Sequence, residues 1–229
     1  MASEAISLDS LISSVKEKTI TMMELAGRSV TDSVRSLGDR DTDLAKKVLG
    51  SDAAIDRLES EIESTCVDIL AGSLSGKRLR FVAATYKIVS DLERIGDYSV
   101  GIANVTLAVA NKPVTRDSLE ITRMAATAEC MLKACEGAYA GREPLMIERV
   151  FGDDVKIDEL YNDIFVKALA SALEEPGTIT NLIYLTIASR ALERIGDHIT
   201  NIAERLEFID TGELRRRDIP MHVPRYPGE

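Results

Sequence analysis

Apolar residues recur along nearly the whole chain at intervals of three and four positions, the spacing at which side chains share one face of an α-helix. One such series is Ile55, Leu58, Ile62, Cys66 and Ile69, and another runs through Ile88, Leu92, Ile95, Ile102 and Val109. Glycine and proline interrupt the periodic segments and mark the ends of helices. The pattern predicts six helices, at about residues 4–37, 40–71, 77–111, 115–140, 144–174 and 178–208.

The second half of the chain repeats the first. The segment Leu92–Asp97, with the sequence LERIGD, returns unchanged at 192–197, and residues 22–62 align without a gap on residues 124–164. Because short connections make successive helices antiparallel neighbours, each copy is predicted to form a three-helix bundle. We therefore expect an all-α protein of two tandem three-helix bundles, with a first domain at 1–112, a second at 113–210 and a non-helical tail at 211–229.

The composition suits closely packed helices and argues against some classes of function. Hydrophobic residues make up 45% of the chain but aromatic residues only 4%, so Ala, Leu, Ile and Val are expected to fill the core. The formal net charge is −10, which argues against a general nucleic-acid surface. An acidic balance instead suits metal cations or basic partner surfaces, although its ordinary effect is solubility.

Cysteine usage and hydropathy indicate a cytoplasmic protein. The three cysteines form no Cys-x-x-Cys unit, and we interpret all three as small core residues. Ser3, Glu4 and Asp9 interrupt the start of the chain, so no secretory signal segment is expected there. No run of apolar residues approaches the length of about eighteen that a transmembrane helix needs.

A pair of carboxylates stands in each copy of the repeated segment. Glu93 and Asp97 lie about 40° apart on one helix face, whereas Ile88, Ile95 and Ile102 lie on the opposite face. The acidic pair therefore points away from the core of its own bundle. In the second copy the stripe consists of Glu193 and Asp197, extended by Asn201 and Glu204.

A second acidic pair lies on the preceding helix of each half. Residues equidistant from the turn of an antiparallel hairpin lie at the same height. In the first half this places Asp56 level with Glu93, and Asp52 level with Asp97. In the second half it places Asp158 level with Glu193, and Asp154 level with Asp197. Each bundle is thus predicted to bring four carboxylates together between two helices.

Such a cluster is suited to metal ions. Four like charges held close together raise one another's pKa unless a cation lies among them. Oxygen ligands suit hard cations, and carboxylates can bridge more than one iron or manganese ion. Di-iron helical bundles also use a Glu-x-x-His ligand. Here His198 lies about 100° around the helix from Asp197 and His222 stands in the tail, so a redox di-iron enzyme is disfavoured.

An ordinary explanation competes with metal binding. Acidic residues on outer helical faces are usually solvated, and Arg94 and Arg194 can neutralise their neighbours in surface ion pairs. In favour of metal, the acidic pairs recur in both halves and meet across each hairpin. The recurring Gly96 and Gly196 each cost a helix about 1 kcal/mol relative to Ala, so we interpret them as residues that allow close helix packing.

These motifs resemble those of the PhoU family. The first motif runs from Leu79–Phe81 to Lys87–Asp97, and the second comprises residues 192–198 and 201–204. Residues 211–216 also resemble the C-terminal sequence of that family, so the resemblance covers essentially the whole chain. It implies two three-helix bundles related by a pseudo-twofold repeat. It also implies multinuclear metal clusters, of iron in the first place and of zinc, nickel or manganese as alternatives. The predicted ligands are Glu93, Asp97, Glu193 and Asp197, then Asp52, Asp56, Asp154 and Asp158, with Asn201 and Glu204 extending the second site.

The resemblance implies a function as well. Family members are cytoplasmic negative regulators of phosphate uptake that couple a phosphate transporter, often through its ATPase subunit, to a sensor kinase. They commonly form homodimers, and their association with the membrane is peripheral and through partners. No catalytic residues and no nucleic-acid partner are implied, so the chain is not expected to be an enzyme.

The sequence departs from the family pattern in ways that distinguish the two halves. Gly101 and Asn104 stand where the second repeat has Asn201 and Glu204, and the usual Pro and Asp before the third helix are absent. On the second helix of each half, Glu59 and Glu63 correspond to Tyr161 and Phe165. The two metal sites are therefore expected to differ in nuclearity or occupancy.

Three other functions stay open at this stage. The first is regulation of another transporter, for potassium or a sodium-coupled phosphate permease. The second is metal-dependent phosphoester hydrolysis, although no positioned nucleophile or general base is visible. The third is an interaction module whose docking face includes Tyr86, Val89 and Val100, beside the acidic stripe.

Overall fold

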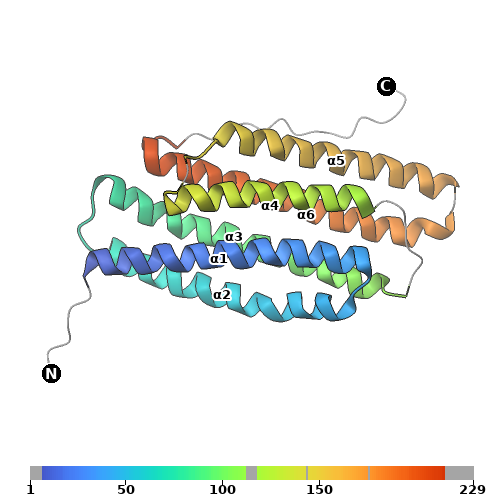
Figure 1. The fold of residues 1–229 in the computed structure, drawn as a ribbon, viewed down its shortest axis with the longest axis horizontal. Coiled ribbons are helices and arrows are strands. Elements are labelled where there is room, and N and C mark those ends of the chain that lie inside the picture. The colour runs from blue at the N-terminus through green and yellow to red at the C-terminus, as the bar shows by residue number, and fades with distance from the viewer. Residues whose placement is uncertain (1–6, 112–117, 143, 175, 215–229) are drawn as a thin grey trace.

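The computed structural model describes residues 7–111, 118–142, 144–174 and 176–214, and this part of the chain is helical between its turns. Its α-helices are α1 (Leu8–Asp39), α2 (Thr42–Leu70), α3 (Gly76–Val109), α4 (Ser118–Ala140), α5 (Ile147–Glu174) and α6 (Ile179–Thr211), with a 3₁₀ turn, η1 (Pro176–Thr178), before α6 (Figure 1). The prediction of an all-α protein with six helices is confirmed.

Local capping explains where the helices begin and end. The Ser7 hydroxyl accepts a hydrogen bond from the Ser10 amide, and the Asp41 carboxylate accepts from the amides of the next turn, so α1 begins at Leu8 and α2 at Thr42. At the other end of the chain, Gly212 has a φ of 77° and donates its N–H to the carbonyl of Phe208. As a result α6 runs to Thr211, beyond the predicted end at 208 and one residue into the predicted tail.

Other predicted boundaries fall outside the described residues. These are the helix starts at residues 4 and 115, the domain boundary at 112–113 and the tail from residue 215 onwards. The division into domains at 1–112 and 113–210 therefore stays a prediction.

The helices form two antiparallel three-helix bundles that lie side by side (Figure 1). In the first bundle α1, α2 and α3 pack on one another, and in the second α4, α5 and α6 do so. Contacts of α3 with α6 and of α1 with α4 join the bundles, whereas α2 and α5 lie on the outer sides. One apolar core runs through both bundles without a break.

The predicted core residues are buried. Ile88, Ile95 and Ile102 are all inaccessible to solvent, as the apolar periodicity of α3 indicated. The interpretation of the cysteines holds for Cys66 and Cys135 but is wrong for Cys130, which is exposed on α4.

Two glycines let the outer helices approach closely. A methyl group added at Gly96 would lie 3.1 Å from Cδ1 of Ile55 and 3.3 Å from Oδ1 of Asp52. A methyl group added at Gly196 would lie only 2.5 Å from Oδ1 of Asp154. The absence of a side chain on α3 and α6 thus brings α2 and α5 against them at the acidic residues, which confirms both glycines as packing residues.

We expect Gly196→Ala to lower the free energy of unfolding by about 1–3 kcal/mol, because overpacking outweighs the better helix propensity of Ala. Gly101→Ala is the matched control, since its added methyl group meets no atom within 4 Å, and it should raise stability by up to about 1 kcal/mol. Urea unfolding followed by circular dichroism measures both changes. Equal stabilities of the two variants would show that the approach of α5 to α6 does not depend on the glycine.

Candidate metal-binding site

The carboxylates of the first half gather along the seam between α2 and α3. Burial raises the pKa of Asp52, and the negative charges of Asp56 and Asp97 raise it further. Asp52 and Asp97 therefore lie near each other across the seam, as the hairpin register predicted. Gly96, beside Asp97, permits this approach because it leaves room for the Asp52 side chain.

Glu93 belongs to the same seam, and a further acid of α2, Glu59, acts on it. Burial raises the pKa of Glu93 to about 7, followed by the charges of Asp97 and Glu59. The pKa of Glu59 is raised as well, by burial and then by Glu63 and Asp56. Glu59 thus lies near enough to Glu93 for its charge to act on it. It was absent from the predicted ligand set, although its place in the acidic stripe was visible in the sequence.

The second half holds its carboxylates more deeply. Asp154 is 1% exposed, and neither of its carboxylate oxygens has a hydrogen-bond partner. Burial raises its pKa to about 7, and the charges of Asp158, Asp197 and Glu193 raise it further. The four acids predicted to meet between α5 and α6 are therefore together in the structure.

Arginine side chains partly neutralise both clusters. Arg194 lies 2.8 Å from Asp197 and 3.6 Å from Glu193, and Arg190 lies 2.6 Å from Glu193. In the first half, Arg94 makes the corresponding contacts to Glu93 and Asp97, at 3.6 Å and 3.3 Å. The surface ion pairs considered from the sequence are thus present. They leave Asp154 without a partner. The pairs to Asp97 and Asp197 are exposed enough to contribute little to stability, whereas Glu93 and Glu193 are only 22% and 13% exposed.

The second half differs from the first at the end of its acidic seam. Tyr161 stands where α2 has Glu59, and the Arg190 guanidinium lies 5.4 Å from the centre of its ring. This cation–π contact holds Arg190 next to Glu193. The second cluster therefore has fewer acids and one more cation than the first.

Asn201 and Glu204 have different surroundings from those predicted. Asn201 donates a hydrogen bond to Oδ1 of Asp91 on α3 at 3.3 Å, and Nδ1 of His198 lies 2.8 Å from the same oxygen. These side chains belong to the contact between α3 and α6. Glu204 is half-exposed on α6 and does not contribute to the pKa shifts of Asp154 or Glu193. A role for Asn201 or Glu204 as a ligand stays a prediction without support from this geometry.

The donor set suits a hard cation, but the side chains are not arranged around one. All of the clustered donors are carboxylate oxygens, the ligands that such cations prefer. Asp154 offers two buried oxygens that lack partners. As the side chains stand, however, no group of three or more His, Cys, Asp or Glu within the described ranges is close enough to hold one ion. Binding would require Arg194 and the acids that it contacts to change rotamer.

One surface feature was missed by the sequence reasoning. An apolar groove of about 280 Å³ lies between α5 and α6 beyond the acidic seam. Its exposed members include Leu169, Ile183 and Ile187, which replace Val67, Ala83 and Lys87 of the first repeat. A comparison of the two repeats at these positions could have found it. The docking face expected beside Glu93 is also smaller than predicted, because Val89 is buried in the core.

Comparison with known proteins covers both halves of the chain. The family model described as "PhoU domain" matches residues 19–106 and again residues 121–206. The chain is 34% identical to a phosphate-specific transport system accessory protein PhoU homolog of Rhizobium meliloti, over 86% of this chain and 84% of that protein. It is 30% identical to a protein of the same description from Deinococcus radiodurans, over 91% of this chain and 98% of the relative.

Solved structures agree with the fold. The crystal structure of PhoU from Pseudomonas aeruginosa matches with a TM-score of 0.86 at 28% identity, over 90% of this chain and all of that one. The structure of the phosphate transport system regulatory protein PhoU from Streptococcus pneumoniae matches with a TM-score of 0.82 at 25% identity, over 92% and 100% of the two chains. These relatives are regulatory and accessory proteins, not enzymes. Across the described residues, none of the helices is both long and apolar enough to cross a membrane.

The stability of metal-free protein is expected to fall as the pH rises from about 4 to about 7. The pKa of Asp154 is about 7 in the folded state, against about 3.9 in an unfolded chain. Between these values the folded state keeps a proton that the unfolded state has lost, so each pH unit lowers the free energy of unfolding by on the order of 1 kcal/mol.

Urea unfolding in EDTA at pH 5, 6, 7 and 8 measures this slope. Asp154→Asn should make it shallower, with Glu93 keeping part of it, whereas Glu159→Gln, an exposed acid on the same helix, should leave it unchanged. The same slope in the wild type and in Asp154→Asn would contradict the assignment of the proton to Asp154.

Proposed function

Because the chain belongs to the PhoU family, we propose that it is a cytoplasmic accessory protein that restrains phosphate uptake and phosphate-responsive signalling. The observation that carries this proposal is the match of the PhoU domain to both repeats, together with relatives described as phosphate-specific transport system accessory proteins. The phosphohydrolase considered from the sequence has no support among these relatives.

The proposed partners are the ATPase subunit of a phosphate transporter and a sensor kinase. The names of the relatives support the first of these, since each is an accessory of a phosphate-specific transport system. The protein would act as a homodimer and reach the membrane only through its partners. Its acidic balance of −10 disfavours nucleic acid as a competing partner.

We further propose that the two acidic seams hold multinuclear metal clusters, of iron in the first place. In the first half Asp52, Asp56, Glu93 and Asp97 would supply the oxygens, with Glu59 as an additional donor. In the second half Asp154, Asp158, Glu193 and Asp197 would do so. A bound cation would stabilise the ionised form of these acids, which burial and mutual repulsion now disfavour. Bound cations would also turn two acidic seams into a positively charged surface.

Protein purified without chelator is expected to carry several equivalents of iron, manganese, zinc or nickel. Glu193→Ala/Asp197→Ala should remove the share bound in the second half, and Glu93→Ala/Asp97→Ala the share in the first. Plasma mass spectrometry of each variant measures the loss. Asp68→Asn/Glu159→Gln, which removes two exposed acids outside the seams, is the matched control. Equal and negligible metal in wild type and variants would reduce both seams to solvated surface.

Deletion of the gene in its host is expected to switch on a phosphate-starvation reporter in phosphate-rich medium, because a negative regulator has been lost. Complementation with the wild-type gene should restore repression. A reporter that stayed repressed after deletion would refute the regulatory role, whatever the metal content of the protein.

A further inference from the structure

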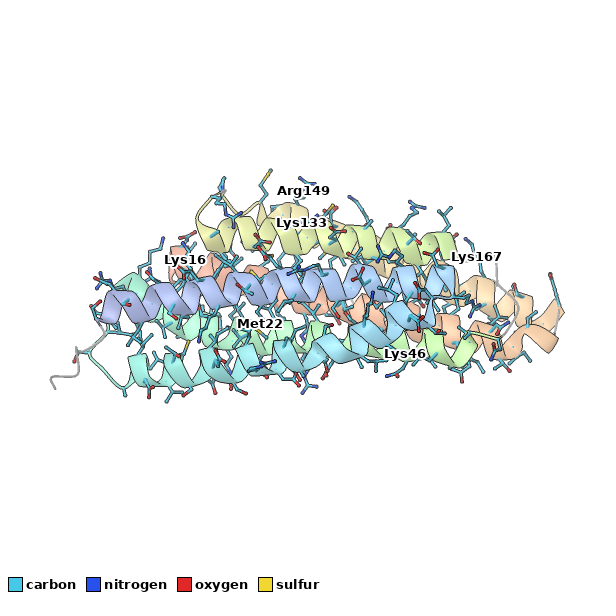
Figure 2. All side chains as sticks on the ribbon, turned by 60° about the horizontal axis from the view of Figure 1, so that its bottom comes forward. Lys16, Met22, Lys46, Lys133, Arg149 and Lys167 are labelled. Atoms are coloured by element: carbon cyan, nitrogen blue, oxygen red, sulfur yellow. The ribbon has the colours of Figure 1, made fainter. Side chains whose placement is uncertain are left out.

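A pocket of about 440 Å³ opens at one end of the molecule, far along the helices from the acidic seams. It lies where α1 and α3 begin and α4 and α6 end, at the left of Figure 1. Three of its lining side chains are cationic: Lys16 from α1, Lys77 from α3 and Arg142 from the turn after α4. Figure 2 shows Lys16 near this end. Asp210 also lines the pocket, so three cations and one acid face it, a positive balance in a chain whose net charge is −10.

These cations are only weakly neutralised. Lys16 donates to the backbone carbonyl of Ala140 at 2.8 Å, a neutral acceptor that leaves its charge uncompensated. Lys77 pairs with Asp210 at 2.6 Å, and both side chains are at least 66% exposed. Arg142 lies 3.3 Å from Glu136 and is itself 61% exposed. The Lys77–Asp210 pair is exposed on both sides, so an anion entering the pocket could replace Asp210 at small cost. The partner of Arg142, Glu136, is only 18% exposed.

One part of the pocket wall is apolar. Phe81 and Tyr139 stack with ring centres 5.3 Å apart, and the Tyr139 hydroxyl lies 2.8 Å from the hydroxyl of Thr85 in the core. Leu145 and Leu206 complete the apolar lining. A cationic rim over an apolar wall suits a ligand with a phosphate at one end and an apolar or aromatic body at the other. The volume lies in the range of small-molecule sites, well above the size of a phosphate ion alone.

Because the chain is a repeat, the pocket can be compared with the equivalent place at the opposite end of the molecule. At the opposite end of the molecule, Arg40 aligns with Arg142 but donates to the carbonyl of Val109 at 2.8 Å. There the hydroxyls of Ser36 and Thr106 also meet, at 3.0 Å. The two arginines differ because α4 ends one residue earlier than α1 in the aligned repeats. The left-handed residue after α4 is Gly141, with a φ of 73°, so Arg142 lies beyond the turn, where it lines the pocket.

Sequence differences reinforce the contrast between the two ends. Lys77 and Phe81 correspond to Gly177 and Asn181, and Tyr139 corresponds to Leu37. Basic residues often bind the last carbonyls of a helix. Lys16 does this at the end of α4, where it donates to Ala140, and Arg80 does it at the end of α6, where it donates to Ile209. Capping does not explain the positions of Lys77 and Arg142, which are exposed and contact acidic side chains.

We propose that this pocket binds a small phosphate ester. Lys16, Lys77 and Arg142 contact the phosphate, and the apolar body of the ligand lies on Phe81 and the adjoining leucines. Ligand binding here is separate from the metal seams and from the proposed restraint of phosphate uptake, and its failure would leave both standing.

Isothermal titration of the full chain tests the proposal, with EDTA present so that metal on the seams cannot bridge to phosphate. The probes are AMP, phenyl phosphate, adenosine and inorganic phosphate. AMP and phenyl phosphate should bind at least about tenfold more tightly than inorganic phosphate, and adenosine should bind no better than inorganic phosphate. Lys77→Glu/Arg142→Glu should weaken the esters at least about tenfold. Lys46→Glu/Lys156→Glu makes the same change of charge on exposed lysines elsewhere and should leave binding unchanged.

A second variant separates the apolar wall from the charge. Phe81→Leu should reduce the preference for phenyl phosphate over inorganic phosphate, with unchanged binding of the inorganic ion. The proposal is overturned if no ester binds, if the esters bind no better than inorganic phosphate, or if the control variant loses as much affinity as the pocket variant. Thermal unfolding of each variant verifies its fold.

Discussion

The close approach of each outer helix to its neighbour at a glycine is the constraint on which the acidic seams depend. At Gly196 the α5 backbone comes so near α6 that the carboxylate of Asp154 occupies the space of a missing methyl group. The same approach excludes water and raises the pKa of Asp154 to about 7. A packing feature and an electrostatic feature of the protein therefore have one cause.

A buried acid without a hydrogen-bond partner can be accommodated in three ways: it can keep a proton, pair with an arginine or bind a cation. Glu193 and Asp197 pair with arginines, Arg190 and Arg194. Asp154 has no such pair, so it must either keep a proton or bind a cation. The Arg194–Asp197 pair is partly exposed, so a cation could replace it at smaller cost than the pairs to Glu193, whose side chain is only 13% exposed. If the proposed metal binding holds, the seams would pass from a partly protonated form to a cation-bound form when metal binds.

Duplication has produced two halves with one architecture and different surfaces. In the first half Glu59 adds a carboxylate to the seam, whereas in the second Tyr161 holds Arg190 against Glu193. The two ends of the molecule differ as well, because Arg40 is bound to the end of α3 and Arg142 faces an open pocket. A substitution at an aligned position accounts for the first difference, and the earlier end of α4 accounts for the second.

By itself the sequence determined the helices, the repeat and the four carboxylates at the centre of each acidic cluster. Helical periodicity depends on neighbouring residues, and the register of a short hairpin follows from its turn, so Asp52 could be placed near Asp97 without a structure. Only the tertiary structure decided how deeply Asp154 is buried, that Glu59 approaches Glu93, and that Asn201 bonds to Asp91 on α3. It also decided that Lys16, Lys77 and Arg142 surround one pocket. These properties depend on side-chain reach and on contacts between helices far apart in the chain, and local spacing carries no information about either.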